Sequence, residues 1–134
     1  MSLINRDTDY AVKAICFMAI NNRKKNTVVD LVRELRIPRP FLRKILQTLN
    51  KKGILKSYKG KEGGFLLAEP ADKIFLMDLM NIFQGKLKLN ECLFKKRICP
   101  NLKTCSLREK LKEIEEYVVS QLKAINIASL IKQG

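Results

Sequence analysis

The chain has 134 residues, the size of a single domain or of one domain with an appended arm. Its hydrophobic content of 46% and charged content of 30% are ordinary for a folded protein, which excludes a disordered chain. No apolar run approaches the roughly 20 residues that a membrane span needs, and the charged N-terminus is unlike a secretory signal. We therefore expect a cytoplasmic protein with no membrane partner.

The net charge is +14, and it is distributed unevenly along the chain. Residues 1–68 carry 15 of the 27 basic side chains but only 5 of the 13 acidic ones. A positive field of this kind favours a nucleic acid partner, because phosphate contacts drive such binding. The chain has no histidine, which removes the commonest general base and the commonest metal ligand. Together these features argue against an enzyme.

The first half of the chain predicts three helices. Apolar residues recur at helical spacing over residues 8–21, with Thr8 as the N-cap. A capping-box pattern opens a second, short helix over residues 27–35. A third helix is expected over residues 40–52, because proline suits its first turn and Gly53 follows as a C-terminal cap.

The third predicted helix has an apolar face and a largely basic face. The residues expected on the buried face are Phe41, Leu42, Ile45, Leu46 and Leu49. The residues expected on the exposed face are Arg39, Arg43, Lys44, Gln47 and Lys51.

Residues 54–67 predict a β-hairpin with a basic, glycine-rich tip. This order of elements, two short helices joined by a tight turn and then a hairpin, is that of a winged helix-turn-helix. Such a fold places its second helix in the major groove of DNA and its wing on the backbone or in the minor groove. We therefore predict a mainly α fold with a small β-hairpin wing, in which residues 1–84 form the DNA-binding domain. The candidate DNA contacts are Arg39, Pro40, Phe41, Arg43, Lys44, Tyr58, Lys59, Gly60 and Lys61.

The second half of the chain predicts a helix over residues 76–83, a cysteine-containing stretch over residues 85–105, and a long helix with a terminal turn over residues 106–134. Apolar residues along the long helix step by four and three, as in a coiled-coil seam, with Gln121 as a polar position. A seam of this kind is typical of a dimerisation helix or of a helix that caps the protein's own core. The candidate interface residues are Leu107, Leu111, Ile114, Val118, Leu122 and Ile125.

Three of the four cysteines are clustered, at Cys92, Cys99 and Cys105, whereas Cys16 lies alone on an apolar helix face and is expected in the core. Their spacing is not the paired C-x2-C arrangement of a zinc ribbon. Clustered thiols in a reducing compartment indicate metal or redox chemistry, and soft thiolates in a loop suit an iron–sulfur cluster. Zinc and ordinary or redox-active thiols stay open as alternatives.

Over essentially its whole length the chain resembles the Rrf-type winged-helix transcription regulators, with their IscR-like, NsrR-like and CymR-like members. The motifs that carry the resemblance are Thr8-Asp9-Tyr10-Ala11, residues 37–46, Gly60, Gly63-Gly64-Phe65, Leu67-Ala68, Gly85 and the three clustered cysteines. The resemblance implies a homodimer, joined through the long C-terminal helix, that binds a palindromic promoter element on double-stranded DNA.

The resemblance also implies that the three clustered cysteines hold a two-iron or four-iron cluster that senses iron–sulfur, redox or nitric oxide status. IscR-like members add a histidine ligand, which this chain lacks. NsrR-like members add an aspartate from the partner's first helix, and Asp9 matches that position; Asp7 and Glu91 are weaker candidates. An acid in a first turn is also an ordinary feature of helices. The alternative is a cluster-free regulator of the same fold, controlled by a partner protein, a small molecule or thiol oxidation.

Overall fold

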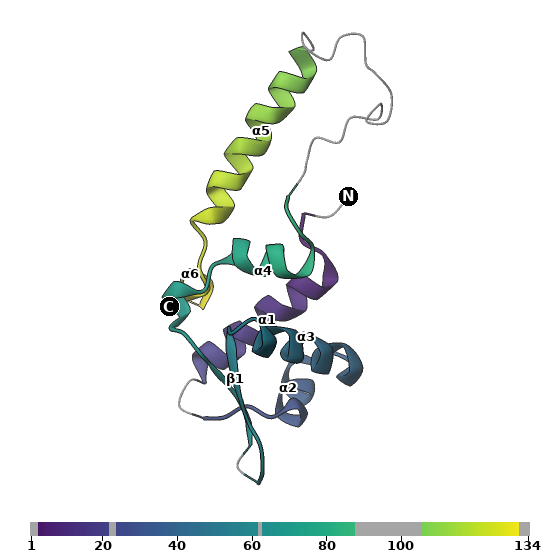
Figure 1. The fold of residues 1–134 in the computed structure, drawn as a ribbon, viewed down its shortest axis with the longest axis vertical. Coiled ribbons are helices and arrows are strands. Elements are labelled where there is room, and N and C mark those ends of the chain that lie inside the picture. Colours follow the sequence, from purple (N-terminus) through teal and green to yellow (C-terminus); the bar gives the residue numbers. More distant parts are fainter. Residues whose placement is uncertain (1–2, 22–23, 62, 88–105, 132–134) are drawn as a thin grey trace.

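The computed structural model describes residues 3–21, 24–61, 63–87 and 106–131. Helices α1–α3 and a hairpin form one end of the molecule, and a long helix, α5, extends from the opposite side of α4 (Figure 1). The elements in chain order are α1 (Arg6–Ile20), α2 (Val28–Leu35), α3 (Arg39–Lys51), β1 (Leu55–Tyr58), β2 (Gly64–Leu67), the 3-10 turn η1 (Ala71–Lys73), α4 (Leu76–Phe83), α5 (Ser106–Lys123) and α6 (Ile127–Ile131). The predicted mainly helical fold with a hairpin wing and a long C-terminal helix is confirmed.

Helix α1 begins earlier than predicted, and its N-cap is Asn5 rather than Thr8. The side-chain oxygen of Asn5 accepts a 2.8 Å hydrogen bond from the backbone N–H of Thr8, which satisfies one free donor of the first turn. Thr8 is fully buried inside the helix, and its hydroxyl donates to Gln84 Oε1 at 2.7 Å. The prediction of Thr8 as the cap is wrong because a contact with a residue 76 positions away determines its role.

The capping box predicted for α2 is present. The backbone N–H of Asp30 donates to the Thr27 hydroxyl at 3.0 Å, and the backbone N–H of Thr27 donates to the Asp30 carboxylate at 3.5 Å. Helix α2 ends at Arg36, which has a left-handed backbone with φ of 56°. Pro40 lies in the first turn of α3, where its missing N–H costs nothing. The tight turn that the helix-turn-helix needs is therefore formed by three residues, Arg36 to Pro38.

The main core lies between α1, α2, α3, β1 and α6. Its fully buried side chains include Ile15, Met18, Leu31, Leu42, Leu46, Leu49, Leu55, Leu79 and Ile127. Ile127 belongs to α6, which packs on α1 and is held there by backbone hydrogen bonds that link Ile74 to Ile127 and Leu76 to Ile125. We predicted that residues 106–134 all belong to the dimerisation part. Helix α6 instead completes the core that α1, α2, α3 and β1 form.

The hairpin pairs β1 with β2 in antiparallel register, from Leu55 opposite Leu67 to Tyr58 opposite Gly64. Asn26 adds a short third pairing through two backbone hydrogen bonds with Phe65, of 3.0 and 2.8 Å. Gly64 has φ of +147°, and a Cβ on it would lie 2.9 Å from the carbonyl oxygen of Asn26. Glycine at position 64 is therefore what allows the connection between α1 and α2 to lie against the wing.

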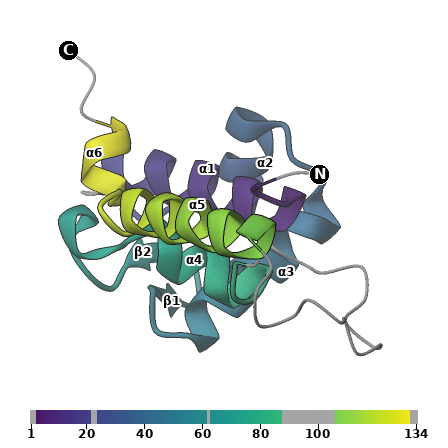
Figure 2. The same cartoon turned by 90° about the horizontal axis from the view of Figure 1, so that it is seen from above.

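Among the described residues, the C-terminal half of helix α5 packs on α4. There Leu122 is buried in a second cluster with Leu76 and Met80 of α4, and Val118 and Ile125 pack against that cluster. Seen from above, α5 runs across α4 and the helices beneath it (Figure 2). In the part of the chain that the structure describes, no helix has the length and apolar character to cross a bilayer.

Candidate DNA-binding surface and sensor residues

Helix α3 exposes the basic face that the sequence predicted. Leu42 and Leu49 are fully buried, and because successive helical residues are about 100° apart, Lys44 and Lys51 lie on the opposite side. The predicted outward residues are all exposed: Arg39, Arg43, Lys44, Gln47 and Lys51. The surface of α3 therefore combines two guanidinium groups, two ammonium groups and an amide, the groups that read base edges and phosphates in a major groove.

Phe41 is not part of the buried face, so this part of the prediction is wrong. It is 40% exposed and lies on the flank of α3, about a quarter turn from the buried stripe. The guanidinium carbon of Arg6 lies 4.4 Å from the centre of its ring. Phe41 keeps its other predicted position, at the outer surface beside the candidate DNA contacts.

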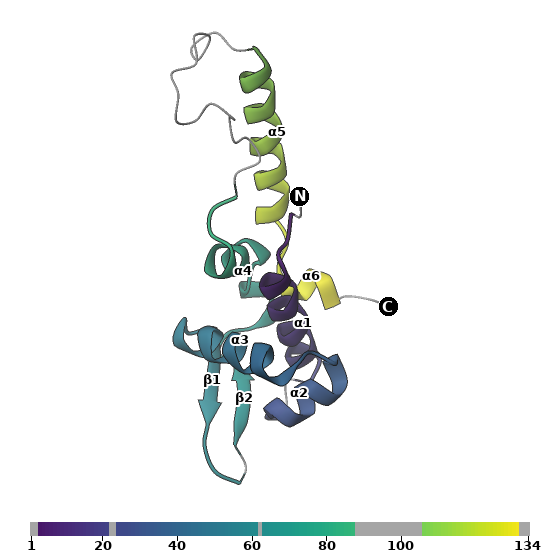
Figure 3. The ribbon, with the colours of Figure 1, turned by 90° about the vertical axis from the view of Figure 1, so that its right-hand side faces the viewer.

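The wing places its basic tip at the same end of the molecule as α3 (Figure 3). Tyr58, Lys59, Gly60 and Lys61, the candidate DNA contacts of the hairpin, are all exposed. Gly60 has φ of +99°, a conformation that favours glycine at this tight turn. The tip can therefore approach a phosphate backbone closely, with two ammonium groups beside it.

Sequence reasoning missed two cations at this end, Arg6 and Lys25. The Lys25 ammonium lies 4.3 Å from the ring centre of Tyr58, so the connection between α1 and α2 adds its charge to the wing. Arg6 stacks on Phe41 in the corresponding way at the start of α3. Neither pair has a local spacing signal, because each joins residues more than 30 positions apart in the sequence.

The six candidate interface residues of α5 fall into two groups. Leu107 and Ile114 are 67% and 54% exposed, and Leu111 is half-buried. Leu122, by contrast, is buried on α4 of its own protomer, with Val118 and Ile125 beside it. Tyr117, which was not predicted, is 66% exposed and lies one turn from Ile114. Among the described residues of α5, the exposed large apolar side chains therefore lie between Leu107 and Tyr117.

Asp9, the candidate cluster ligand, lies in the first turn of α1. Its half-exposed carboxylate is 2.8 Å from the Lys13 ammonium, and this hydrogen-bonded pair raises the pKa of Lys13. Across residues 3–21, 24–61, 63–87 and 106–131, no three cysteine or carboxylate side chains gather as metal ligands. Cys92, Cys99, Cys105 and Glu91 lie outside those ranges.

Cys16, predicted as a core thiol, packs against the main core. Burial raises the pKa of this thiol, so it stays protonated and is a poor nucleophile and metal ligand at neutral pH. The clustered cysteines, rather than Cys16, remain the candidates for redox or metal chemistry.

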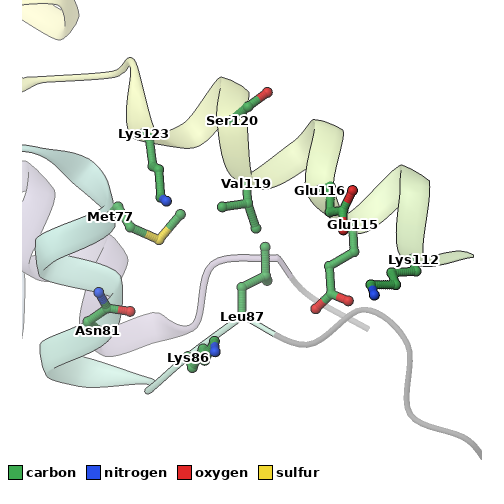
Figure 4. A pocket seen from close by; sticks show the side chains of 10 residues that line it. All are labelled: Met77, Asn81, Lys86, Leu87, Lys112, Glu115, Glu116, Val119, Ser120 and Lys123. Atoms are coloured by element: carbon green, nitrogen blue, oxygen red, sulfur yellow. The ribbon is translucent and has the colours of Figure 1, made fainter.

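A groove of about 780 Å³ lies between α4 and α5 (Figure 4). Met77 and Val119 face it from the two helices, and Leu87 lies on its floor. Glu115, Glu116, Lys112 and Lys123 form its charged rim. Leu87 is the last residue that the structure describes before residue 106.

The N-terminus of α1 is tied to the residue that follows α4. Gln84 Oε1 accepts hydrogen bonds from the Asn5 backbone N–H at 3.0 Å and from the Thr8 hydroxyl at 2.7 Å. The Gln84 side-chain amide donates to the Leu3 carbonyl at 2.9 Å, and the Asn5 amide donates to the Phe83 carbonyl at 3.2 Å. Four hydrogen bonds thus join the segment that carries Asp9 to the point where the cysteine-containing stretch begins.

Comparison with known proteins agrees with this geometry. The sequence model of the Rrf2 family, described as an iron-dependent transcriptional regulator, matches residues 4–133. A protein of Aquifex aeolicus (strain VF5), whose assigned name describes an HTH-type transcriptional regulator, is 32% identical over 124 residues, which span 91% of this chain and 86% of that protein.

Two solved structures share the fold. CymR, the global cysteine regulator of B. subtilis, superposes with a TM-score of 0.82 at 20% identity, over 98% of this chain and 97% of that one. IscR of T. potens superposes with a TM-score of 0.69 at 25% identity, over 96% of this chain and 85% of that one. The chain belongs to the Rrf2 family of transcriptional regulators.

Proposed function

We propose that the protein is a homodimeric regulator that binds a palindromic promoter element and responds to an iron–sulfur cluster held by its clustered cysteines. The observation that carries the DNA-binding part is the outward basic face of α3 beside the basic wing. Arg43 and Lys44 are suited to the O6 and N7 acceptors of guanine in the major groove. Lys59 and Lys61 would contact phosphates from the wing.

Dimerisation is supported by the outer half of α5. Leu107, Ile114 and Tyr117 are exposed there, and a coiled-coil seam on two such helices buries these side chains against a second copy. Two-fold symmetry of the protein then matches the symmetry of a palindromic DNA element.

The sensor part rests on the chemistry of the donor set, three thiolates and one carboxylate. Cys92, Cys99 and Cys105 would ligate iron, and Asp9 of the partner subunit would supply the fourth ligand. When bound, such a cluster supplies an iron centre that can be lost, oxidised or nitrosylated. Asp9 Oδ2 contacts the Lys13 ammonium, so an Asp9 that bound iron would either displace Lys13 or use its second carboxylate oxygen.

The hydrogen bonds around Gln84 give this response a direct connection to the DNA-binding half. A change in the cysteine-containing stretch would act on Leu3, Asn5 and Thr8, and therefore on the helix that carries Asp9 and Arg6. The expected coupling free energy between the sensor and DNA is of the usual size for such systems, about 1–3 kcal/mol.

One experiment separates the parts of this proposal. The protein is purified without oxygen, its iron and sulfide are quantified, and its binding to promoter fragments is titrated at several salt concentrations. We expect a coloured protein whose colour is lost in Cys92→Ala, Cys99→Ala and Cys105→Ala but retained in Cys16→Ala. A colourless, iron-free protein that still binds DNA would refute the cluster and leave the cluster-free regulator. Absence of DNA affinity at low salt would refute the proposed function itself.

A further inference from the structure

The first turn of α1 meets the first turn of α3 through an unusual pair of exposed side chains. The guanidinium of Arg6 lies over the ring of Phe41, with 4.4 Å between the guanidinium carbon and the ring centre. Phe41 is 40% exposed and the Arg6 side chain is 60% exposed, so the pair lies at the surface. The ring is partly covered by a cation rather than by other apolar side chains, which places an aromatic and a guanidinium group together at the edge of a basic helix.

The Arg6 guanidinium carries five N–H donors, and the side chain stays largely exposed while it lies over the ring. The nearest carboxylate oxygen, on Asp7, is 3.9 Å from Arg6 Nε, which is too far for a hydrogen bond. Arg6 is therefore an exposed cation held beside Phe41, with Asp7 at ion-pair distance but not hydrogen-bonded to Arg6 Nε.

The pair also lies beside the surface that faces DNA in the proposed function. Phe41 precedes Lys44 by one helical turn, so the two side chains are neighbours on the same edge of α3. Arg6 extends this edge beyond α3 itself, at the end of the helix opposite to the one that leads into the wing. An oriented guanidinium is the group best suited to bind a phosphate through two hydrogen bonds.

We propose that Arg6 is a DNA backbone contact positioned by the ring of Phe41, so that the start of α1 forms a third contact region beside α3 and the wing. The inference rests on the proposed DNA binding. The contact is made to phosphate and not to a base, so it strengthens binding to any sequence and shifts the salt dependence of binding.

The test compares Arg6→Ala with Lys112→Ala, which removes an equal charge from exposed α5. Binding is titrated over a series of salt concentrations, both to duplexes that the wild-type protein selects from a random library and to a random duplex of equal length. For Arg6→Ala we expect about a tenfold loss on both duplexes and a decrease of about 1 per protomer in the salt slope. Lys112→Ala is expected to change neither quantity.

A double-mutant cycle tests the role of the ring. Phe41→Leu keeps the bulk without the aromatic face, and Phe41→Tyr keeps both. We expect Phe41→Leu to weaken binding in the wild-type background and much less in Arg6→Ala, and Phe41→Tyr to retain the affinity. Thermal unfolding of each variant shows that it is folded.

Three outcomes would overturn the inference while wild-type DNA binding stays intact. Arg6→Ala could match Lys112→Ala in affinity and in salt slope, which excludes the contact. It could lose affinity for the selected duplex only, which indicates a base contact. An effect of Phe41→Leu that is unchanged in Arg6→Ala would exclude positioning by the ring. A wild-type protein that binds neither duplex would instead refute the proposed function.

Discussion

The two ends of the molecule expose opposite kinds of surface. At the hairpin end, α3 buries its apolar face completely and turns lysines, arginines and a glutamine outward. At the far end of α5, the exposed side chains include Leu107, Ile114 and Tyr117. Water solvates the charged outer face of α3 well, so this surface is stable when it is exposed. The second surface would gain stability if another apolar surface covered it.

This difference indicates that the two ends of the chain are suited to two different kinds of partner. The basic end is suited to a polyanion, with an affinity that depends on salt. In the proposed dimer, a second copy would cover the exposed apolar side chains of α5, with an affinity that depends on burial. Substitutions at the two ends should therefore change different measurements, and each of the following predictions tests that separation.

The largest effect is expected at the basic end. Replacing Arg43 and Lys44 together by alanine removes two of the proposed major-groove contacts from each protomer, and a good base contact contributes about 1–3 kcal/mol. We expect at least about a hundredfold loss of affinity for a selected duplex, and a smaller loss for a random one. Fluorescence anisotropy measures both. A double variant of α5, Lys110→Ala with Lys112→Ala, is the charge-matched control, and an equal loss in that control would contradict the assignment.

The next effect contrasts the two halves of α5. Leu122→Ala opens a cavity against α4 and should lower the free energy of unfolding by about 2–5 kcal/mol. Ile114→Glu places a charge on the exposed half and should convert the dimer to a folded monomer. Chemical denaturation measures the first effect, and light scattering coupled to size exclusion measures the second. A dimer that persists in Ile114→Glu would show that the outer half of α5 is not the interface.

A smaller effect is expected where the wing joins the rest of the protein. In Gly64→Ala, the new Cβ would lie 2.9 Å from the Asn26 carbonyl oxygen on a backbone with φ of +147°. The strain should cost about 1–3 kcal/mol of unfolding free energy. Gly60→Ala is the matched control, because φ is also positive there but no atom lies within 4 Å of the new Cβ. Equal losses in the two variants would mean that the contact with Asn26 contributes nothing.

The smallest effect concerns the cap of α2. Thr27→Ala should lower the free energy of unfolding by about 1 kcal/mol. Hydrogen bonding from the Thr27 side chain, and more weakly from its backbone N–H and from Arg33, lowers the pKa of Asp30 below its usual 3.8. A carboxyl whose pKa is lower in the folded state stabilises the fold above its unfolded value, and this contribution is lost as the pH falls through the folded value.

The corresponding measurement is denaturation at pH 7 and at pH about 3, below the ordinary pKa of an aspartate. Wild type should lose more stability on acidification than Asp30→Asn. Glu34→Gln on the same helix should behave as wild type, because it removes a carboxylate that is not part of the Thr27–Asp30 capping box. Identical pH profiles for wild type and Asp30→Asn would show that the cap does not depend on the charge of Asp30.

Local patterns predicted most of the fold. The helix predicted over residues 76–83 has those bounds in the structure, and the hairpin and the α2 capping box are also present. These features depend on hydrophobic spacing and on turn residues within a few positions of each other. The exposed residues of α3 followed from the same spacing, because a helix with one buried face exposes the other.

The sequence could not predict the features that depend on distant residues. Thr8 is a buried residue whose hydroxyl binds Gln84 rather than a cap, and Phe41 contacts Arg6 at the surface rather than the core. The seam on α5 was predicted as one surface, whereas its C-terminal half packs on α4. For the cysteines, spacing and the resemblance remain the basis of the prediction.

The attachment of α5 has a consequence for the DNA elements that a dimer can use. Directly after α5, Asn126 pairs with Phe75, and Ile127 enters the core beneath α1, so no flexible linker separates the helix from the DNA-reading domain. If two α5 helices pair in the proposed dimer, their pairing also fixes the distance and the rotation between the two winged helix-turn-helix units. Such a dimer would bind only operators with one spacing between the half-sites. Insertion of a few base pairs at the centre of the operator should therefore prevent the second protomer from binding its half-site.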